Sequence, residues 1–328
     1  MKESLTKLCE SFLANSETIY KQKGFKLVST KLMPMCSYMY TTSGSQIDPE
    51  RLQECLKLVK ENGGGGLSGL RDAFQAALAC TLAVSEDPAG FMDTAVANFE
   101  KLKKAYSDSK YIGVAATLLP KIGKPEDLDE KIARGKVIFD CLKTRHKMKT
   151  NYHDTLMTSI AAYSDKPVEV IADEIEKISA ELKDVTNGEY AQVCALILVC
   201  SDKPAEEKCA RVKEFYEALT NDKKNKYSNG PEIMTLTALS LFKADAGALT
   251  NDILEVAELL AEKKHYKGLV KIYGRDERML HATMMVMANN MTDDMYVLSI
   301  AAMYLSVFYM YEIEQGISST IGILPLLT

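Results

Sequence analysis

Residues 193–219 read VCALILVC-SDKP-AEEKCARVKEFYEAL, which is an apolar run, a polar turn ending in proline, and a charged segment. The apolar run has no polar face, so it predicts a helix that is buried on all sides. In the charged segment apolar residues recur three or four positions apart, which predicts a helix with one apolar stripe. These residues are Cys209, Val212, Phe215 and Leu219. Proline suits the turn because the first turn of a helix needs no backbone N–H at that position.

The same order of features recurs along the chain. Five prolines stand at intervals of 39, 37, 42 and 37 residues: Pro49, Pro88, Pro125, Pro167 and Pro204. An apolar run precedes each of them, over residues 32–39, 76–84, 114–119, 156–162 and 193–200. A sixth unit has Ala246-Gly247 in place of proline, then Thr250-Asn251 as the expected helix cap and a striped helix over 253–261. A seventh apolar run starts near His281.

These units predict the architecture. One hairpin cannot bury its own apolar helix, so neighbouring units must stack on each other. We predict an all-α fold of tandem antiparallel helical hairpins with a period near 39 residues, stacked as an α/α solenoid or toroid. The sequence leaves the open and the closed form as alternatives. We expect a single domain over residues 1–328, with a leading helix and first hairpin in 1–62, tandem hairpins in 67–268 and a helical cap in 269–328.

Composition and charge exclude some classes of protein. With 47% hydrophobic and 26% charged residues, the chain resembles ordinary globular proteins. A net charge of −5 argues against a nucleic-acid binder, because binding to phosphates needs clustered cations that outnumber nearby acids. The one basic cluster, over residues 143–149, is short. We therefore expect no nucleic-acid partner.

The termini and cysteines indicate a compartment. The N-terminal ten residues contain two glutamates where a secretory signal requires an unbroken apolar stretch. The eight cysteines are scattered through a chain that is too large to need disulfides, so we expect reduced thiols and a cytoplasmic location. Residues 296–311 are uncharged but fall short of the ~20 residues of a membrane-spanning helix. We expect a buried terminal helix and no transmembrane segment.

Three stretches carry a resemblance to a known family. They are Leu67-Ser68-Gly69-Leu70-Arg71, the run from Ala73 to Pro88, and Tyr111-Ile112-Gly113-Val114-Ala115-Ala116-Thr117-Leu118-Leu119. With the order of helices and turns from Tyr20 to Met287, they resemble the domain-of-unknown-function family 4003 of Firmicutes. The resemblance implies a bacterial, cytosolic protein. It supplies no catalytic residues.

Phosphate binding is a possible role for one glycine run. Gly63-Gly64-Gly65-Gly66 precedes a predicted helix, so its backbone N–H groups could face a phosphate with help from Arg71. No Gly-Lys-Ser or Gly-Lys-Thr follows and no strand precedes the run, which argues against a P-loop or a dinucleotide site. We interpret the run as a link between the first and second hairpins.

Metal and cofactor sites are not indicated. The four histidines show no His-x-x-x-His spacing, and Cys194 and Cys200 point to different faces of one helix. Asp293-Asp294 resembles an aspartate-rich magnesium box, but Val297 stands where a third aspartate would be needed. We interpret the pair as a helix cap. We therefore predict no metal-binding and no cofactor-binding residues.

Acid–base and nucleophilic catalysis have weak candidates. His153 and Asp154 are adjacent, so their side chains point in different directions on a helix. His281 follows Arg275, Asp276 and Glu277, and we interpret this group as a solvated link between repeats. Cys80 and Cys194 lie in apolar runs, which raise the pKa of a thiol and make it unreactive. We predict no catalytic residue.

Methionine and tyrosine are abundant toward the C-terminus. Met279, Met284, Met285, Met287 and Met291 precede Met295, Tyr296, Met303, Tyr304, Tyr309 and Met310. Such residues build adaptable surfaces for partner helices, but we expect most of them in the core. Our leading hypothesis is a non-enzymatic helical-repeat module that binds another protein or a peptide. Alternatives are an α/α-toroid enzyme acting on a small substrate and peripheral membrane attachment through Tyr296–Leu327.

Overall fold

The computed structural model describes residues 1–22, 30–62, 73–107, 109–146, 150–186, 188–268 and 271–314. Within these ranges it contains 15 α-helices and no strand. The prediction of an all-α fold is therefore confirmed.

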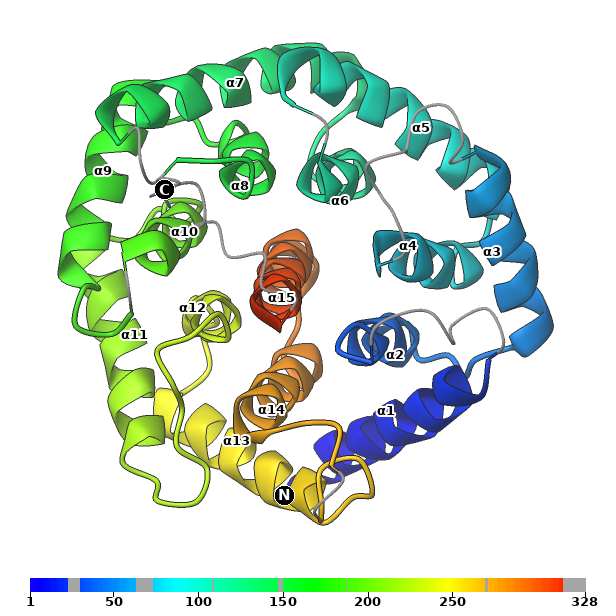
Figure 1. The fold of residues 1–328 in the computed structure, drawn as a ribbon. Coiled ribbons are helices and arrows are strands. Elements are labelled where there is room, and N and C mark those ends of the chain that lie inside the picture. Colours follow the sequence, from blue (N-terminus) through cyan, green and yellow to red (C-terminus); the bar gives the residue numbers. More distant parts are fainter. Residues whose placement is uncertain are drawn as a thin grey trace, which may run out of the picture.

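The helices form an outer and an inner layer around one central helix (Figure 1). The outer helices are α1 (Glu3–Lys21), α3 (Pro49–Asn62), α5 (Pro88–Ala105), α7 (Leu128–Arg145), α9 (Val168–Glu181), α11 (Ala205–Thr220) and α13 (Ala246–Ala261). The inner helices are α2 (Met33–Thr42), α4 (Ala73–Ala83), α6 (Lys110–Leu118), α8 (Asp154–Ala161), α10 (Gly188–Leu198), α12 (Ile233–Ser240) and α14 (Arg275–Asn289). Helix α15 (Asp293–Glu314) lies in the middle, and the outer helices lie across the inner ones along the periphery.

The two ends of the helical series meet. Helix α1 contacts α14 and lies beside α13, so the layers close on themselves (Figure 1). Lys2, which immediately precedes α1, donates from Nζ to Asp252 Oδ2 of α13 at 2.7 Å. The N-terminal amine lies 2.6 Å from Glu255 Oε2 of the same helix. Phe12 of α1 packs near His281 of α14, with 6.1 Å between ring centroids.

The apolar patterns account for the two layers. All eleven residues of α10 except its first two are buried, as expected for a helix with neighbours on every side. Helix α9 buries one stripe that contains Ile171, Ile175 and Ile178, each at most 1% exposed. The expected cap at Thr250-Asn251 is wrong, because α13 already begins at Ala246. Its cap is Asp245, whose side chain accepts a hydrogen bond from the backbone N–H of Ala248 at 2.8 Å.

Helix α15 has 22 residues, which corresponds to a length of about 33 Å. By length and composition it is apolar enough to cross a membrane, but 78% of its most apolar window is buried inside the protein. It contacts α2, α6, α8, α12 and α14. The buried terminal helix expected from the sequence is therefore the centre of the fold.

The same arginine contact links three outer helices, α3, α7 and α11, to the end of the next inner helix along the chain. Arg211 of α11 donates from Nε to the Ser240 carbonyl at 2.7 Å and from Nη2 to the Phe242 carbonyl at 2.9 Å. Arg134 of α7 donates in the same way to Ala162 and Ser164, both at 3.1 Å. The last carbonyls of a helix lack intrahelical partners and carry partial negative charge, so a guanidinium satisfies and neutralises them. Arg51 of α3 does the same after α4.

This contact predicts a stability effect. Arg211→Met should lower the free energy of unfolding by about 2 kcal/mol, because several carbonyls lose a charged donor. Lys57→Met is the matched control, since Lys57 forms an exposed pair with Glu61 and should change stability by less than about 0.5 kcal/mol. Urea unfolding measures both. Equal effects of the two substitutions would contradict the capping role.

Candidate functional site

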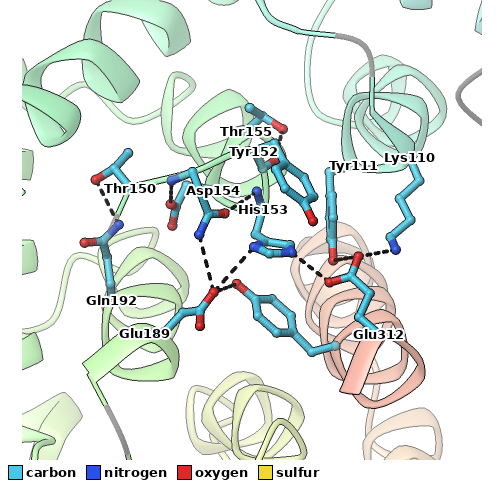
Figure 2. A network of polar contacts seen from close by, with 12 residues as sticks. Lys110, Tyr111, Thr150, Tyr152, His153, Asp154, Thr155, Glu189, Gln192 and Glu312 are labelled. Atoms are coloured by element: carbon cyan, nitrogen blue, oxygen red, sulfur yellow. Dashed lines mark hydrogen bonds and ion pairs between the residues drawn. The ribbon is translucent and has the colours of Figure 1, made fainter. Parts of the chain in front are cut away.

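The two ends of α15 lie in different surroundings. At its C-terminal end a group of polar side chains converges, which we call the His153 cluster: Lys110, Tyr111, His153, Glu189, Tyr309 and Glu312 (Figure 2). Lys110 and Tyr111 begin α6, His153 immediately precedes α8, and Glu189 is the second residue of α10. Tyr309 and Glu312 lie in the last turns of α15. The starts of three inner helices therefore meet the end of the central helix.

His153 lies between two carboxylates. Its Nε2 is 2.8 Å from Glu312 Oε2 and its Nδ1 is 3.5 Å from Glu189 Oε1, and the side chain is 0% exposed. Glu312 Oε1 accepts from the ammonium of Lys110 and, at 3.3 Å, from the Tyr111 hydroxyl. Both carboxylate oxygens of Glu312 are therefore engaged by groups of the inner ring (Figure 2).

Glu189 belongs to the same network. Its Oε1 accepts from the Tyr309 hydroxyl and from Asn151 Nδ2, each at 3.3 Å. Aromatic rings enclose the imidazole of His153: the ring centroids of Tyr152 and Tyr309 lie 4.1 and 4.3 Å away. The cluster thus combines ion pairs with a mostly apolar enclosure, where electrostatic interactions are stronger than in water.

The charges in the cluster stabilise each other. Burial alone lowers the pKa of His153, but the carboxylates of Glu189 and Glu312 outweigh burial and raise that pKa above its ordinary value. Burial would raise the pKa of Glu312, but His153 and Lys110 outweigh it and lower that pKa. The inner helices α6, α8 and α10 also point their positive ends at these carboxylates. The cluster is therefore a set of mutually neutralised charges that fixes α15 to the ring.

At the opposite end of α15 the surface is hollowed. A groove of about 580 Å³, which we call the end groove, lies between the ends of α8, α10 and α12, the segment after α6 and the first turns of α15. Its apolar lining includes Ile122, Ile160, Tyr163, Leu241, Val297 and Leu298. Its charged lining comprises Lys121, Lys166, Lys203, Lys243, Asp165, Asp202, Asp293 and Asp294. A second hollow of about 490 Å³ between α5 and α6 shares Lys121 with it.

Some of the groove lysines already have partners. Lys166 Nζ donates to Glu174 Oε2 at 3.0 Å and to the Ser201 carbonyl at 3.1 Å, and Lys203 Nζ donates to Glu207 Oε1 at 2.6 Å. The groove therefore offers an apolar surface with charges of both signs around it.

The structure places the sequence candidates as follows. The run Gly63–Gly66 and Arg71 lie outside the described residues. Asp293 and Asp294 are the first two residues of α15, so they lie inside its first turn, where the helix dipole favours acidic side chains. Within the part of the chain that the structure describes, no group of three or more potential ligands lies close enough to hold a metal ion.

The interpretation of the His281 group as a solvated link is wrong, because Arg275, Asp276 and Glu277 form the first turn of α14 and His281 lies further along the same helix. His281 is 1% exposed, because it lies on the buried face of α14. Its Nδ1 is 2.7 Å from the Tyr266 hydroxyl, and burial lowers its pKa to about 3. His281 is therefore a neutral core histidine.

The pKa values of the buried thiols are raised, as their apolar surroundings predict. Burial raises the pKa of Cys194 to about 12 and raises that of Cys80 well above its ordinary value. The methionines and tyrosines near the C-terminus lie mostly in the core: Met279, Met284, Met285, Met287, Met303, Tyr304 and Tyr309 are buried.

His153 and Asp154 do point in different directions, but the sequence reasoning missed the partners of His153. Glu189 comes from the next repeat and Glu312 from the central helix, so no sequence spacing joins them. One feature of the sequence could have pointed to this cluster: Lys110, His153 and Glu189 each lie within two residues of the start of an inner helix.

Asp154 gives a test of this region. Burial raises the pKa of its carboxyl to about 6, so the ionised form costs stability above that pH and the cost falls as pH drops toward 4. Asp154→Asn should therefore be more stable than the wild type at pH 8 by about 1–3 kcal/mol, with the gain mostly lost at pH 4.5. Urea unfolding at both pH values measures this. A gain that does not depend on pH would contradict the assignment.

A family model described as "Protein of unknown function (DUF4003)" matches residues 16–314. The match extends beyond the Tyr20–Met287 range of the sequence resemblance and takes in the whole of α15. No curated protein and no solved structure matches the chain. Because the match covers most of the sequence, the chain belongs to the DUF4003 family.

Proposed function

We propose that this protein is a non-enzymatic helical-repeat module, a closed α/α toroid of hairpins, that binds a segment of another protein in the end groove. The starts of the inner helices at residues 33, 73, 110, 154, 188, 233 and 275 support the repeat near 39 residues. The observation that carries the proposal is the position of α15, which fills the space that the ring encloses (Figure 1).

The filled centre weighs against the toroid enzyme. Small substrates bind in concave pockets that bury most of their surface, and a toroid would offer one inside its ring. Here that place is taken by side chains such as Ile300, Met303 and Phe308, all 0% exposed. The converging acids that an enzyme would need are present in the His153 cluster, but they bind the chain's own cations.

The end groove fits a protein segment better than a small molecule. Together with the adjoining hollow it extends from α5 across the end of the inner layer to α12. On an elongated surface with apolar residues and dispersed charges, alternate side chains of a bound segment can contact apolar residues and charges in turn. Ile122 is 36% exposed in it, so a large apolar side chain is available for contact.

Membrane attachment through the C-terminus has weaker support. The apolar window of α15 is 78% buried, so lipid contact along α15 would require its removal from the ring. The acidic net charge and eight free cysteines support a cytoplasmic module without nucleic-acid partners.

A random dodecapeptide library displayed on phage tests the proposal. Peptides selected on the wild type should bind Ile122→Asp at least about tenfold more weakly, because an apolar contact in the groove is replaced by a charge. Val137→Asp is the matched control, since Val137 is 55% exposed on the outer helix α7, away from the groove. Isothermal titration calorimetry measures affinity, and circular dichroism confirms that both variants fold.

Two results would overturn the proposal. One is a set of selected peptides that bind Ile122→Asp as tightly as the wild type. The other is the failure of the library to yield any peptide that binds the wild type.

A further inference from the structure

Polar contacts between α15 and the inner ring concentrate in few places. At the C-terminal end Glu312 contacts His153 and Lys110, and the Tyr309 hydroxyl donates to Glu189. In the middle the Ser306 hydroxyl lies 2.8 Å from Thr235 Oγ1 of α12. At the groove end Lys121 lies over the ring of Tyr296, 5.5 Å from its centroid.

Between these places α15 presents mostly apolar side chains, with Ser299 and Tyr304 as the polar exceptions. Val297, Ile300, Met303 and Val307 are buried at 8% exposure or less, and Ser299 is buried without a hydrogen-bond partner among the described residues. Apolar burial is not directional, so the polar contacts add directional constraints to those that side-chain packing places on the rotation and depth of the helix.

The end groove depends on that position. Asp293, Asp294, Met295, Val297 and Leu298 of α15 form one side of the groove, and the other sides belong to the ring. A helix is stiff over 22 residues, so a shift or rotation at Glu312 moves the side chains at Val297 and Leu298. The two ends of α15 are therefore mechanically connected.

On the basis of the proposed function, we propose that the contacts of Glu312 with His153 and Lys110 form a latch that sets the position of α15 and thereby regulates segment binding in the end groove. Loss of the charge on His153 loosens the latch and weakens binding. Each end of α15 thus affects the other through one element that both share.

The surroundings of the latch determine its response to pH. The titratable groups around the latch come from four helices. They are Lys110 and Tyr111 from α6, Tyr152 and Asp154 around the start of α8, Glu189 from α10 with Tyr190 against Tyr309, and Tyr309 and Glu312 from α15 with Tyr311 near Lys110. The raised pKa of His153 means that the latch is strongest below its ordinary pKa and weakens as pH rises through the folded value. Asp154 is ionised over that range, since its pKa is about 6.

Hydrogen exchange tests the latch independently of any ligand. Glu312→Gln should raise the exchange rate of amides 293–300 relative to amides of α9, and Tyr309→Phe should do so more weakly. Glu277→Gln is the matched control, because Glu277 pairs with Lys31 between α14 and the segment before α2, apart from α15. Increased exchange only at residues 306–314, or equally in every helix, would overturn the latch.

Peptide affinity then tests its link to the groove. A peptide selected on the wild type should bind Glu312→Gln at least about fivefold more weakly, the lower limit of usual coupling between sites. Wild-type affinity should fall between pH 6.5 and pH 8.5, and that change should be smaller in Glu312→Gln. Unchanged affinity in a variant with the expected exchange pattern would overturn the regulatory link. Failure to select any peptide would overturn only the proposed function, because the exchange measurement stands without it.

Discussion

A 22-residue helix that is apolar on all sides is stable in water only when other helices surround it, and the inner layer surrounds α15. Each buried Leu, Ile, Phe or Met of α15 contributes about 1.5–3 kcal/mol relative to exposure. The inner helices that contact α15 must then be apolar both toward α15 and toward the outer layer, which explains why every residue of α12 is buried. The outer helices pack against the inner layer on one face only, and they accordingly carry one apolar stripe.

Apolar burial explains why the layers adhere, and polar contacts explain how they are aligned. Arg51, Arg134 and Arg211 bind the carbonyls that end inner helices in the following repeat, which fixes one repeat against the next. Glu312 does the same for α15 by contacting Lys110 of α6 and His153 at the start of α8. A buried ion pair adds little net stability once the loss of hydration is included, so specifying one arrangement is its better-supported role here.

Local pattern predicted the helices well because each one reflects its own surroundings. The stripe of Ile171, Ile175 and Ile178 and the unstriped run 193–200 are readable without knowing their neighbours. The sequence did not predict the position of α15 in the fold, because a uniformly apolar helix suits any fully buried position. The sequence did not predict the His153 cluster either. Its glutamates lie 36 and 159 positions from His153, and only the stacking of α8 on α10 and the central place of α15 bring them together. Asp245 was missed as a cap because Thr250-Asn251 offered an equally suitable pair of residue types.

The direction of the inner helices makes the two ends of the ring chemically different. Helices α6, α8 and α10 all start at the end where α15 finishes, so their positive termini favour the carboxylates of Glu189 and Glu312 there. His153 and Lys110 form ion pairs with those carboxylates, and the surrounding tyrosines enclose these ion pairs. At the other end the helix carbonyls are neutralised from outside by arginines of the outer layer, which leaves the space between the inner helices free for the end groove. The polarity of the helices thus explains why the hollow and the latch occupy opposite ends of α15.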